Sequence, residues 1–127
     1  MSEFANLILR FIKLTIIICF VTHWNACIFY GVALNADNPN SWIKHNNLED
    51  EPLTVKYVTA LYWAFTTMMS IGYGDIYAGS TYERMATVWC IIISSGIFSF
   101  IIGDIGKMVR NFNVLAAHFR ERMLYVE

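Results

Sequence analysis

The segment Ser70 to Asp75 carries the residue types and spacing with the clearest chemical use in this 127-residue chain. It contains Gly-Tyr-Gly, and glycine tolerates positive φ, so consecutive backbone carbonyls can point the same way where a Cβ would oppose it. Carbonyl oxygens gathered on one axis can take the place of water around a cation. Alone, the tripeptide is also compatible with a surface turn. Its position between two long apolar runs favours the first interpretation, because each run can cross a bilayer.

The composition indicates a membrane protein. Hydrophobic residues make up 57% of the chain and charged residues only 15%, which is too apolar for a small soluble domain. The net charge of −1 and the absence of a basic patch argue against nucleic-acid binding. Cys19, Cys27 and Cys90 are an odd set inside apolar runs, so we expect buried thiols rather than disulfides. The three histidines have no metal-ligand spacing.

Two charge-free runs predict membrane-spanning helices. Leu14 to Ala36 has 23 residues without Asp, Glu, Lys or Arg, and Met85 to Gly103 has 19, where about 20 are needed to cross a bilayer. A signal peptide is the competing interpretation of the first run, but the run is too long and lacks a small-x-small cleavage site. Both termini are predicted to be cytoplasmic, because six of the nine basic residues flank the inner ends of the runs: Arg10, Lys13, Lys107, Arg110, Arg120 and Arg122.

Between the runs, Leu53 to Met69 predicts a short helix that enters the membrane without crossing it. Such backbone survives only where protein or a water-filled cavity surrounds it. Its C-terminal end would direct partial negative charge at a central cavity and favour a cation there. The preceding polar loop carries the acidic run Glu49 to Glu51, which either raises the cation concentration at an outer mouth or is simply solvated.

The segment Ser70 to Asp75 resembles the potassium-channel selectivity filter, whose usual form is Thr-Val-Gly-Tyr-Gly. The resemblance implies that backbone oxygens replace the hydration shell of K⁺. Tyr62 and Trp63 are similar to the aromatic pair that packs behind that filter, and Asp75 corresponds to the aspartate that hydrogen-bonds to the pair. The implied ion-binding residues are Ser70, Ile71, Gly72, Tyr73 and Gly74, with K⁺ held at the first four.

Other motifs resemble the pore of cyclic-nucleotide-gated channels, and the likeness runs from about Phe4 to Glu127. His23 to Tyr30 matches their outer helix, and Gly103-Asp104-Ile105-Gly106 parallels their Gly-Asn-Ile-Gly step. The implied fold is an all-α membrane protein with two transmembrane helices, a re-entrant pore helix and a filter loop, assembled as a tetramer. Residues 1–110 would be the pore domain, with an outer helix at about 4–34, a turret at 35–52, a pore helix at 53–69, the filter at 70–75 and an inner helix at 84–110. Residues 111–127 would begin a cytoplasmic linker helix.

Three polar or aromatic residues in the middle of the first run are expected to face protein rather than lipid. They are His23, Trp24 and Asn25, and an unpaired polar group facing lipid is costly. For His23 two roles stay open, proton sensing and packing between helices.

The second run carries a predicted gate. Phe98, Ile102 and Ile105 share one helical face, and by resemblance Phe98 and Ile102 narrow the cytoplasmic end of the pore, where an apolar ring stops ions by dewetting. A lipid-facing stripe would have the same composition. Gly96 is a candidate hinge, or a site of close packing. Asp104 either adds charge to the inner mouth or pairs with a nearby basic residue.

These observations predict a K⁺-selective channel pore, regulated by cyclic nucleotide, voltage or both, in a homotetramer or pseudo-tetramer of like subunits in the plasma membrane. Met69 and Ser70 replace two threonines and leave open a weakly selective Na⁺/K⁺ pore of the pacemaker type, whereas Asp75 favours selectivity. A non-conducting assembly subunit is the other alternative. No enzyme activity is predicted, because Gly72-x-Gly74 lacks the rest of a dinucleotide motif. No cofactor is expected, and K⁺ is the permeating ion.

Overall fold

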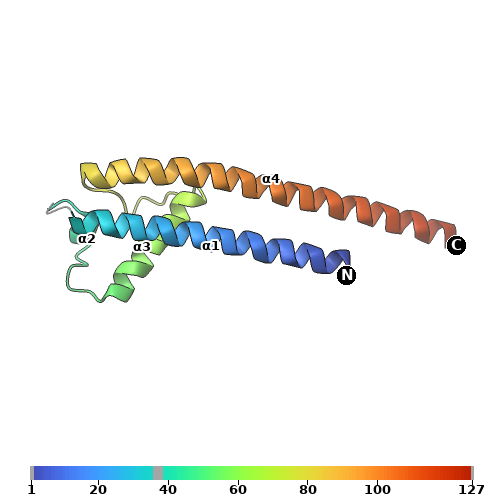
Figure 1. The fold of residues 1–127 in the computed structure, drawn as a ribbon, viewed down its shortest axis with the longest axis horizontal. Helices are drawn as coiled ribbons and strands as arrows, with labels where there is room; N and C mark the ends of the chain where they lie inside the picture. Colours follow the sequence, from blue (N-terminus) through green and yellow to red (C-terminus); the bar gives the residue numbers. More distant parts are fainter. Residues whose placement is uncertain (1, 36–38, 127) are drawn as a thin grey trace.

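The computed structural model describes residues 2–35 and 39–126, which form four α-helices and no strand. The helices are α1 (Glu3–Asn35), α2 (Trp42–His45), α3 (Leu53–Met68) and α4 (Thr81–Val126). Helices α1 and α4 lie side by side and run in opposite directions, and α3 crosses them at an angle near one end of the molecule (Figure 1). The N- and C-termini both lie toward the end of the molecule that is farther from α3, on the right in Figure 1. Residues 36–38 of the predicted turret lie outside the described residues.

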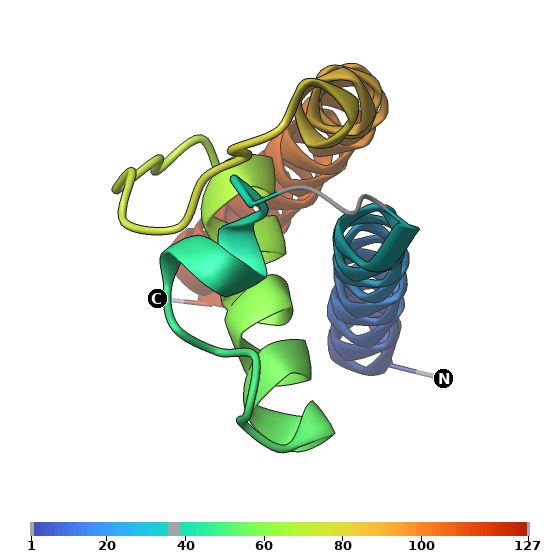
Figure 2. The ribbon, with the colours of Figure 1, turned by 90° about the vertical axis from the view of Figure 1, so that its left-hand side faces the viewer.

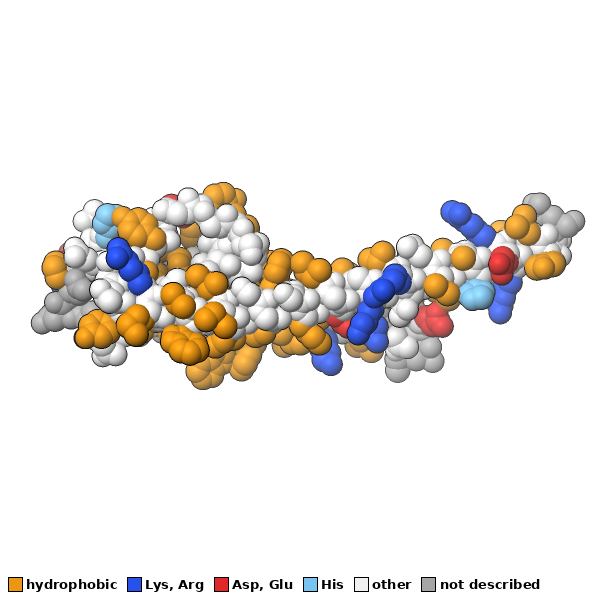
Figure 3. Space-filling view, turned by 90° about the horizontal axis from the view of Figure 1, so that it is seen from above, with side chains coloured by type: hydrophobic (Ala, Val, Ile, Leu, Met, Phe, Trp, Pro, Cys, Tyr) orange, Lys and Arg blue, Asp and Glu red, His pale blue; other side chains and the backbone are white. Residues whose placement is uncertain are grey.

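Helices α1 and α4 are the two that are long and apolar enough to cross a membrane in the described part of the chain. With 33 and 46 residues they are about 50 Å and 69 Å long, against about 30 Å for the hydrocarbon core. In Figure 3 apolar side chains gather over the left-hand and central part of the visible face, and most of the charged side chains lie from the middle to the right-hand end. The predicted all-α fold with two membrane helices is therefore confirmed.

The inner helix differs from the prediction at both ends. It begins at Thr81 rather than at residue 84, and it continues to Val126 without a break at 110. The continuity follows from the sequence after Gly106, which contains no glycine or proline. The boundary between a pore domain and a linker helix at 110/111 therefore stays a prediction, since no structural feature marks it.

The predicted turret contains a helix that its polar composition did not suggest. Ser41 caps α2, and its side chain accepts a hydrogen bond from the Lys44 backbone N–H. Trp42 and Ile43 are buried, so this short helix belongs to the core rather than to a solvated loop. The acidic residues that follow remain exposed, and Lys44 pairs with Glu49 at 3.9 Å.

A buried polar contact joins the two membrane helices. The Asn25 side-chain amide donates to the Ser94 hydroxyl at 2.7 Å, and both residues are buried. The expectation that Trp24 also faces protein is wrong for the single chain, because its side chain is 56% exposed. Adjacent helical residues point about 100° apart, so Asn25 can face α4 while Trp24 turns outward.

Removing this contact should destabilise the fold modestly. Asn25→Ala is expected to lower the free energy of unfolding by roughly 1 kcal/mol, the scale of hydrogen bonds between membrane helices. A double-mutant cycle with Ser94→Ala, followed by thermal unfolding in detergent, measures the coupling between the two side chains. Ser95→Ala, on an exposed neighbour, is the control. Fully additive single-variant effects would contradict the proposed pairing.

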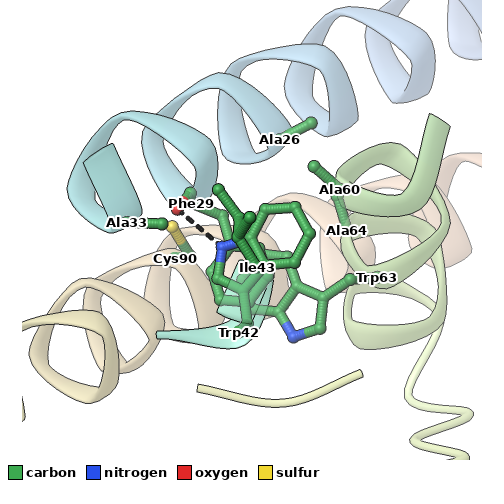
Figure 4. Close-up of a cluster of buried hydrophobic side chains, with 9 residues drawn as sticks. All are labelled: Ala26, Phe29, Ala33, Trp42, Ile43, Ala60, Trp63, Ala64 and Cys90. Carbon is green, nitrogen blue, oxygen red and sulfur yellow. Dashed lines mark hydrogen bonds between the residues drawn. The ribbon is translucent and has the colours of Figure 1, made fainter. Parts of the chain in front are cut away.

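Two hydrophobic clusters hold the helices together. One lies where the end of α3 meets the N-terminal half of α1 and the middle of α4, and it contains Leu14, Met68, Ile101 and Met108. The other lies toward the opposite end of α1 and contains Trp42, Phe29, Trp63 and the alanines between them (Figure 4). The three cysteines are free, as the composition suggested, but only Cys90 is buried, whereas Cys19 and Cys27 are exposed in the single chain.

Candidate functional site

The backbone of the predicted filter alternates in conformation. Ser70, Gly72 and Gly74 have φ values of 58°, 62° and 78°, whereas Ile71 and Tyr73 between them have no positive φ. Alternation of this kind turns successive peptide planes so that their carbonyls project to the same side, and glycine accepts it without strain. Ser70 carries a Cβ, so its left-handed conformation costs about 1–2 kcal/mol. A strained residue at this position is a mark of functional constraint.

Hydrogen bonds to α3 hold the start of this segment. The Ser70 N–H donates to the Thr67 carbonyl at 3.2 Å. The Thr66 carbonyl accepts from the N–H groups of Ile71 and Gly72, at 2.8 and 3.3 Å. These bonds use the N–H groups of the segment and the carbonyls of the helix. They tie the segment to α3 without using its own carbonyl oxygens.

The segment lies on the open side of α3. Every residue from Ser70 to Asp75 is exposed in the single chain, and Tyr73 is 70% exposed. The loop that follows α3 lies on the side of that helix away from α1 (Figure 2). The segment therefore lies on a face of the single chain that is free to contact an ion or another copy.

Tyr62, Tyr73 and Asp75 lie together beside the segment. The rings of Tyr62 and Tyr73 are nearly parallel, with centroids 6.5 Å apart. A side-chain hydrogen bond from Tyr62 to Asp75 raises the pKa of the phenol, and partial desolvation and the carboxylate charge act in the same direction. Tyr62 belongs to α3, which does not span the membrane.

Trp63 has a different neighbourhood from Tyr62. It is buried and stacks on Phe29 of α1, with centroids 3.7 Å apart and planes 9° from parallel. Phe29 also stacks on Trp42 at 4.9 Å, and its carbonyl accepts a hydrogen bond from the Trp42 indole at 3.1 Å (Figure 4). The two residues predicted as an aromatic pair thus face different partners: Tyr62 supports the segment, and Trp63 joins α3 to α1 and α2.

His23 contacts the pore helix directly. Its Nδ1 lies 2.6 Å from the Tyr57 hydroxyl, and the two rings meet edge to face. Its Nε2 lies 3.6 Å from the Cys27 sulfur on its own helix. These contacts favour the packing role between α1 and α3 over the proton-sensing role.

The predicted gate residues are available to other chains. Ile102 is 54% exposed and Phe98 is half-buried, whereas Ile97 and Ile101 pack against α1. The two pairs lie about a quarter turn apart around α4. The geometry of one chain leaves the gate assignment as a prediction.

Gly96 and Asp104 show fewer contacts than the sequence suggested. Outside the neighbouring backbone of α4, no heavy atom of the described residues lies within 4 Å of a Cβ built on Gly96, so close packing against another part of the chain is not its role there, and α4 continues through it unbroken. The ion pairs between described residues are Lys44–Glu49 and His118–Glu121. Asp104 is therefore not paired with Lys107 or Arg110 in this part of the chain.

Sequence reasoning missed the role of Glu83. It is fully buried at the start of α4. The Glu83 N–H donates to the Ser80 hydroxyl at 3.2 Å, and the Ser80 N–H donates to the Glu83 carboxylate at 3.3 Å. This is a reciprocal capping box, and the spacing Ser-x-x-Glu was a usable signal.

Comparison with known proteins identifies relatives of this arrangement. The ion transport protein family matches residues 1–117. The chain is 31% identical over 115 residues to potassium channel AKT1 of Arabidopsis thaliana. It is 30% identical over 122 residues to potassium channel AKT3, and 33% identical over 110 residues to potassium channel KAT4, both of Oryza sativa subsp. japonica. These matches cover 88%, 94% and 84% of this chain but only 13%, 14% and 19% of the relatives, so the chain spans less than a fifth of their length.

The matches confirm the resemblance to a channel pore that the motifs carried, and they support a channel rather than an enzyme. Nearly the whole chain takes part in the family match, including the two membrane helices and the segment between them. The chain belongs to the ion transport protein family.

Proposed function

We propose that this chain is one quarter of a K⁺-selective pore that conducts passively across the membrane. The observation that carries the proposal is the alternating backbone of residues 70–74, which presents carbonyl oxygens along one side of an exposed segment. Four such segments around an axis would surround a dehydrated ion, and repulsion between neighbouring ions would keep binding from becoming a trap. The relatives are named as potassium channels, which supports K⁺ as the ion.

A tetramer of this chain accounts for its exposed apolar surface. Ile71 is 52% exposed and Tyr73 70% exposed in one copy, although both would be covered around a shared axis. The positive residues at the ends of α1 and α4 support cytoplasmic termini, and we place the pore in the plasma membrane. Regulation by cyclic nucleotide or voltage, which the resemblance implies, is part of the same proposal.

Ion flux from reconstituted chain tests the proposal. Purified tetramers in liposomes with an outward K⁺ gradient should carry K⁺, and bi-ionic reversal potentials should favour K⁺ over Na⁺. Nearly equal permeability to K⁺ and Na⁺ would favour the weakly selective alternative, which Met69 and Ser70 leave open because they replace two threonines. Absence of flux from verified tetramers would favour the non-conducting subunit.

Truncating the predicted gate should raise leak through the closed pore. In Phe98→Ala the apolar side chains around the proposed pore become smaller. Water can then fill the constriction, and ions can pass without opening of the inner helices. The measurement is K⁺ flux from tetramers under conditions that keep the wild-type pore closed. Phe100→Ala removes a 63% exposed phenylalanine from the opposite side of the same helix and serves as control. Unchanged closed-state flux in Phe98→Ala would move the gate to another position.

A further inference from the structure

The Glu83 carboxylate makes more contacts than a helix cap needs. A capping box accounts for its bond to the Ser80 N–H. The same oxygen, Oε2, also accepts from the Gly79 N–H at 2.9 Å. The other oxygen, Oε1, accepts from the Trp42 N–H at 3.3 Å, in the turret. Helix capping explains neither of these last two bonds.

These groups connect three parts of the outer end of the molecule, and we call Trp42, Gly79, Ser80 and Glu83 the outer clamp. Trp42 belongs to α2, Gly79 and Ser80 end the loop that leaves the predicted filter, and Glu83 belongs to α4. The N–H groups of Trp42, Gly79 and Ser80 all donate to one carboxylate, which is fully buried, so solvent does not compete for it. Bonds to a charged acceptor are also stronger than those between neutral groups.

Independent contacts bring the same two segments together. A Cβ built on Gly79 would lie 1.8 Å from the Asn40 carbonyl oxygen, so only glycine permits this approach of the loop to the turret backbone. The Tyr77 hydroxyl lies 2.6 Å from His45 Nε2 at the exposed edge. Ile76 and Ala78 pack against the cluster around Trp42. The loop is therefore fastened to the turret along its length.

The clamp controls the outer end of the predicted filter. Residues 75–79 form no helix or strand, so side-chain and cap contacts set the position of this loop. Gly79, at the far end of this loop, is held by Glu83. Gly74, the last residue with positive φ, directly precedes the loop. Movement of the loop would tilt the last carbonyls of the segment away from a common axis.

We propose that Glu83 is a positioning residue for ion selectivity, because it fixes the loop that carries the outer end of the filter. The inference rests on the proposed K⁺ conduction. On this inference, Glu83 contributes to the discrimination between K⁺ and Na⁺ although it lies outside the predicted filter and does not contact the ion.

The test compares reconstituted Glu83→Gln tetramers with wild type. The amide has one acceptor oxygen, and its NH₂ group would face a backbone N–H, so at least one bond of the clamp is lost. The K⁺/Na⁺ permeability ratio from bi-ionic reversal potentials should fall about tenfold, the scale of one unmade buried hydrogen bond. Glu83→Asp keeps the charge but shortens the reach, and its ratio should be intermediate. Glu51→Gln, on an exposed turret residue, removes the same charge and should leave the ratio unchanged.

The outcomes separate this inference from the proposed function. If the wild-type chain carries no K⁺, the proposed function fails and the inference with it. If the wild type is selective and Glu83→Gln has the same ratio with only a lower melting temperature, Glu83 is merely structural and the inference is overturned. An equal shift in Glu51→Gln would also overturn it, because the cause would be charge at the mouth. Should Glu83→Gln tetramers not form, Glu83→Asp decides: it keeps the charge and shortens the reach to Trp42 and Gly79, and an unchanged ratio overturns the inference.

Discussion

Gly72→Ala is expected to abolish K⁺ flux while leaving the tetramer assembled. Gly72 has a φ of 62°, and an L-residue with a Cβ pays about 1–2 kcal/mol in this region, at four symmetric positions in the proposed pore. Beyond Gly72 and its two chain neighbours, no heavy atom of the described residues lies within 4 Å of the new Cβ, so the effect acts through the backbone and not through a clash. Relief of the strain rotates the peptide planes and removes carbonyls from the shared axis. Liposome flux measures the loss, and size-exclusion chromatography measures assembly.

Gly31→Ala is the matched control for this substitution. Gly31 lies within α1, has no positive φ and has nothing within 4 Å of a built Cβ. Alanine in a helix interior is favoured over glycine by about 1 kcal/mol, so this variant should conduct normally. Normal currents from Gly72→Ala would refute the assignment of the filter.

Trp42→Ala is expected to produce the largest loss of stability. Trp42 is fully buried, stacks on Phe29 and donates its indole N–H to the Phe29 carbonyl. Truncation of a core aromatic costs about 3–5 kcal/mol, because contacts are lost and a cavity remains. The turret would detach from α1 and from the outer clamp together. Thermal unfolding in detergent should show a much lower midpoint, and the yield of tetramer should fall.

Two variants define the origin of that loss. Trp42→Phe keeps an aromatic ring on Phe29 but removes the indole donor, and it should cost less than Trp42→Ala. Trp89→Ala removes a tryptophan that is 65% exposed on α4 and should change the midpoint little. Equal midpoints for Trp42→Ala and Trp89→Ala would show that the stacked rings do not hold the turret.

The sequence predicted the parts of the fold that depend on residue type over long runs. The charge-free runs predicted α1 and the membrane section of α4, and the predicted helix 53–69 agrees with α3 to within one residue. Glycine at positions 72 and 74 predicted the positive φ values there. Serine does not favour positive φ, so the conformation of Ser70 was beyond prediction from its type. It follows from the neighbouring hydrogen bonds that tie Ile71 and Gly72 to Thr66.

The outer end of the molecule was harder to predict because its core is assembled from distant segments. Trp42 lies in a polar stretch, and only its contact with Phe29, 13 residues earlier in the chain, explains its burial. Acidic side chains at helix starts are usually solvated, so the residue type of Glu83 does not predict its burial. The capping-box spacing gave a local hint for Ser80, but no pattern relates Glu83 to Trp42 across 41 residues.

Helix α4 is long and is held at its outer end by the clamp, so a movement of its other end would pivot about the clamp. From Thr81 the helix reaches Ile102 after about 32 Å and Val126 after about 68 Å, without an interruption along the way. A swing about the outer end that carries Val126 sideways by about 10 Å therefore carries Ile102 by about 5 Å. If α4 turns as a rigid rod, a force applied at Val126 moves Ile102 about half as far, and the force transmitted at Ile102 is about twice as large.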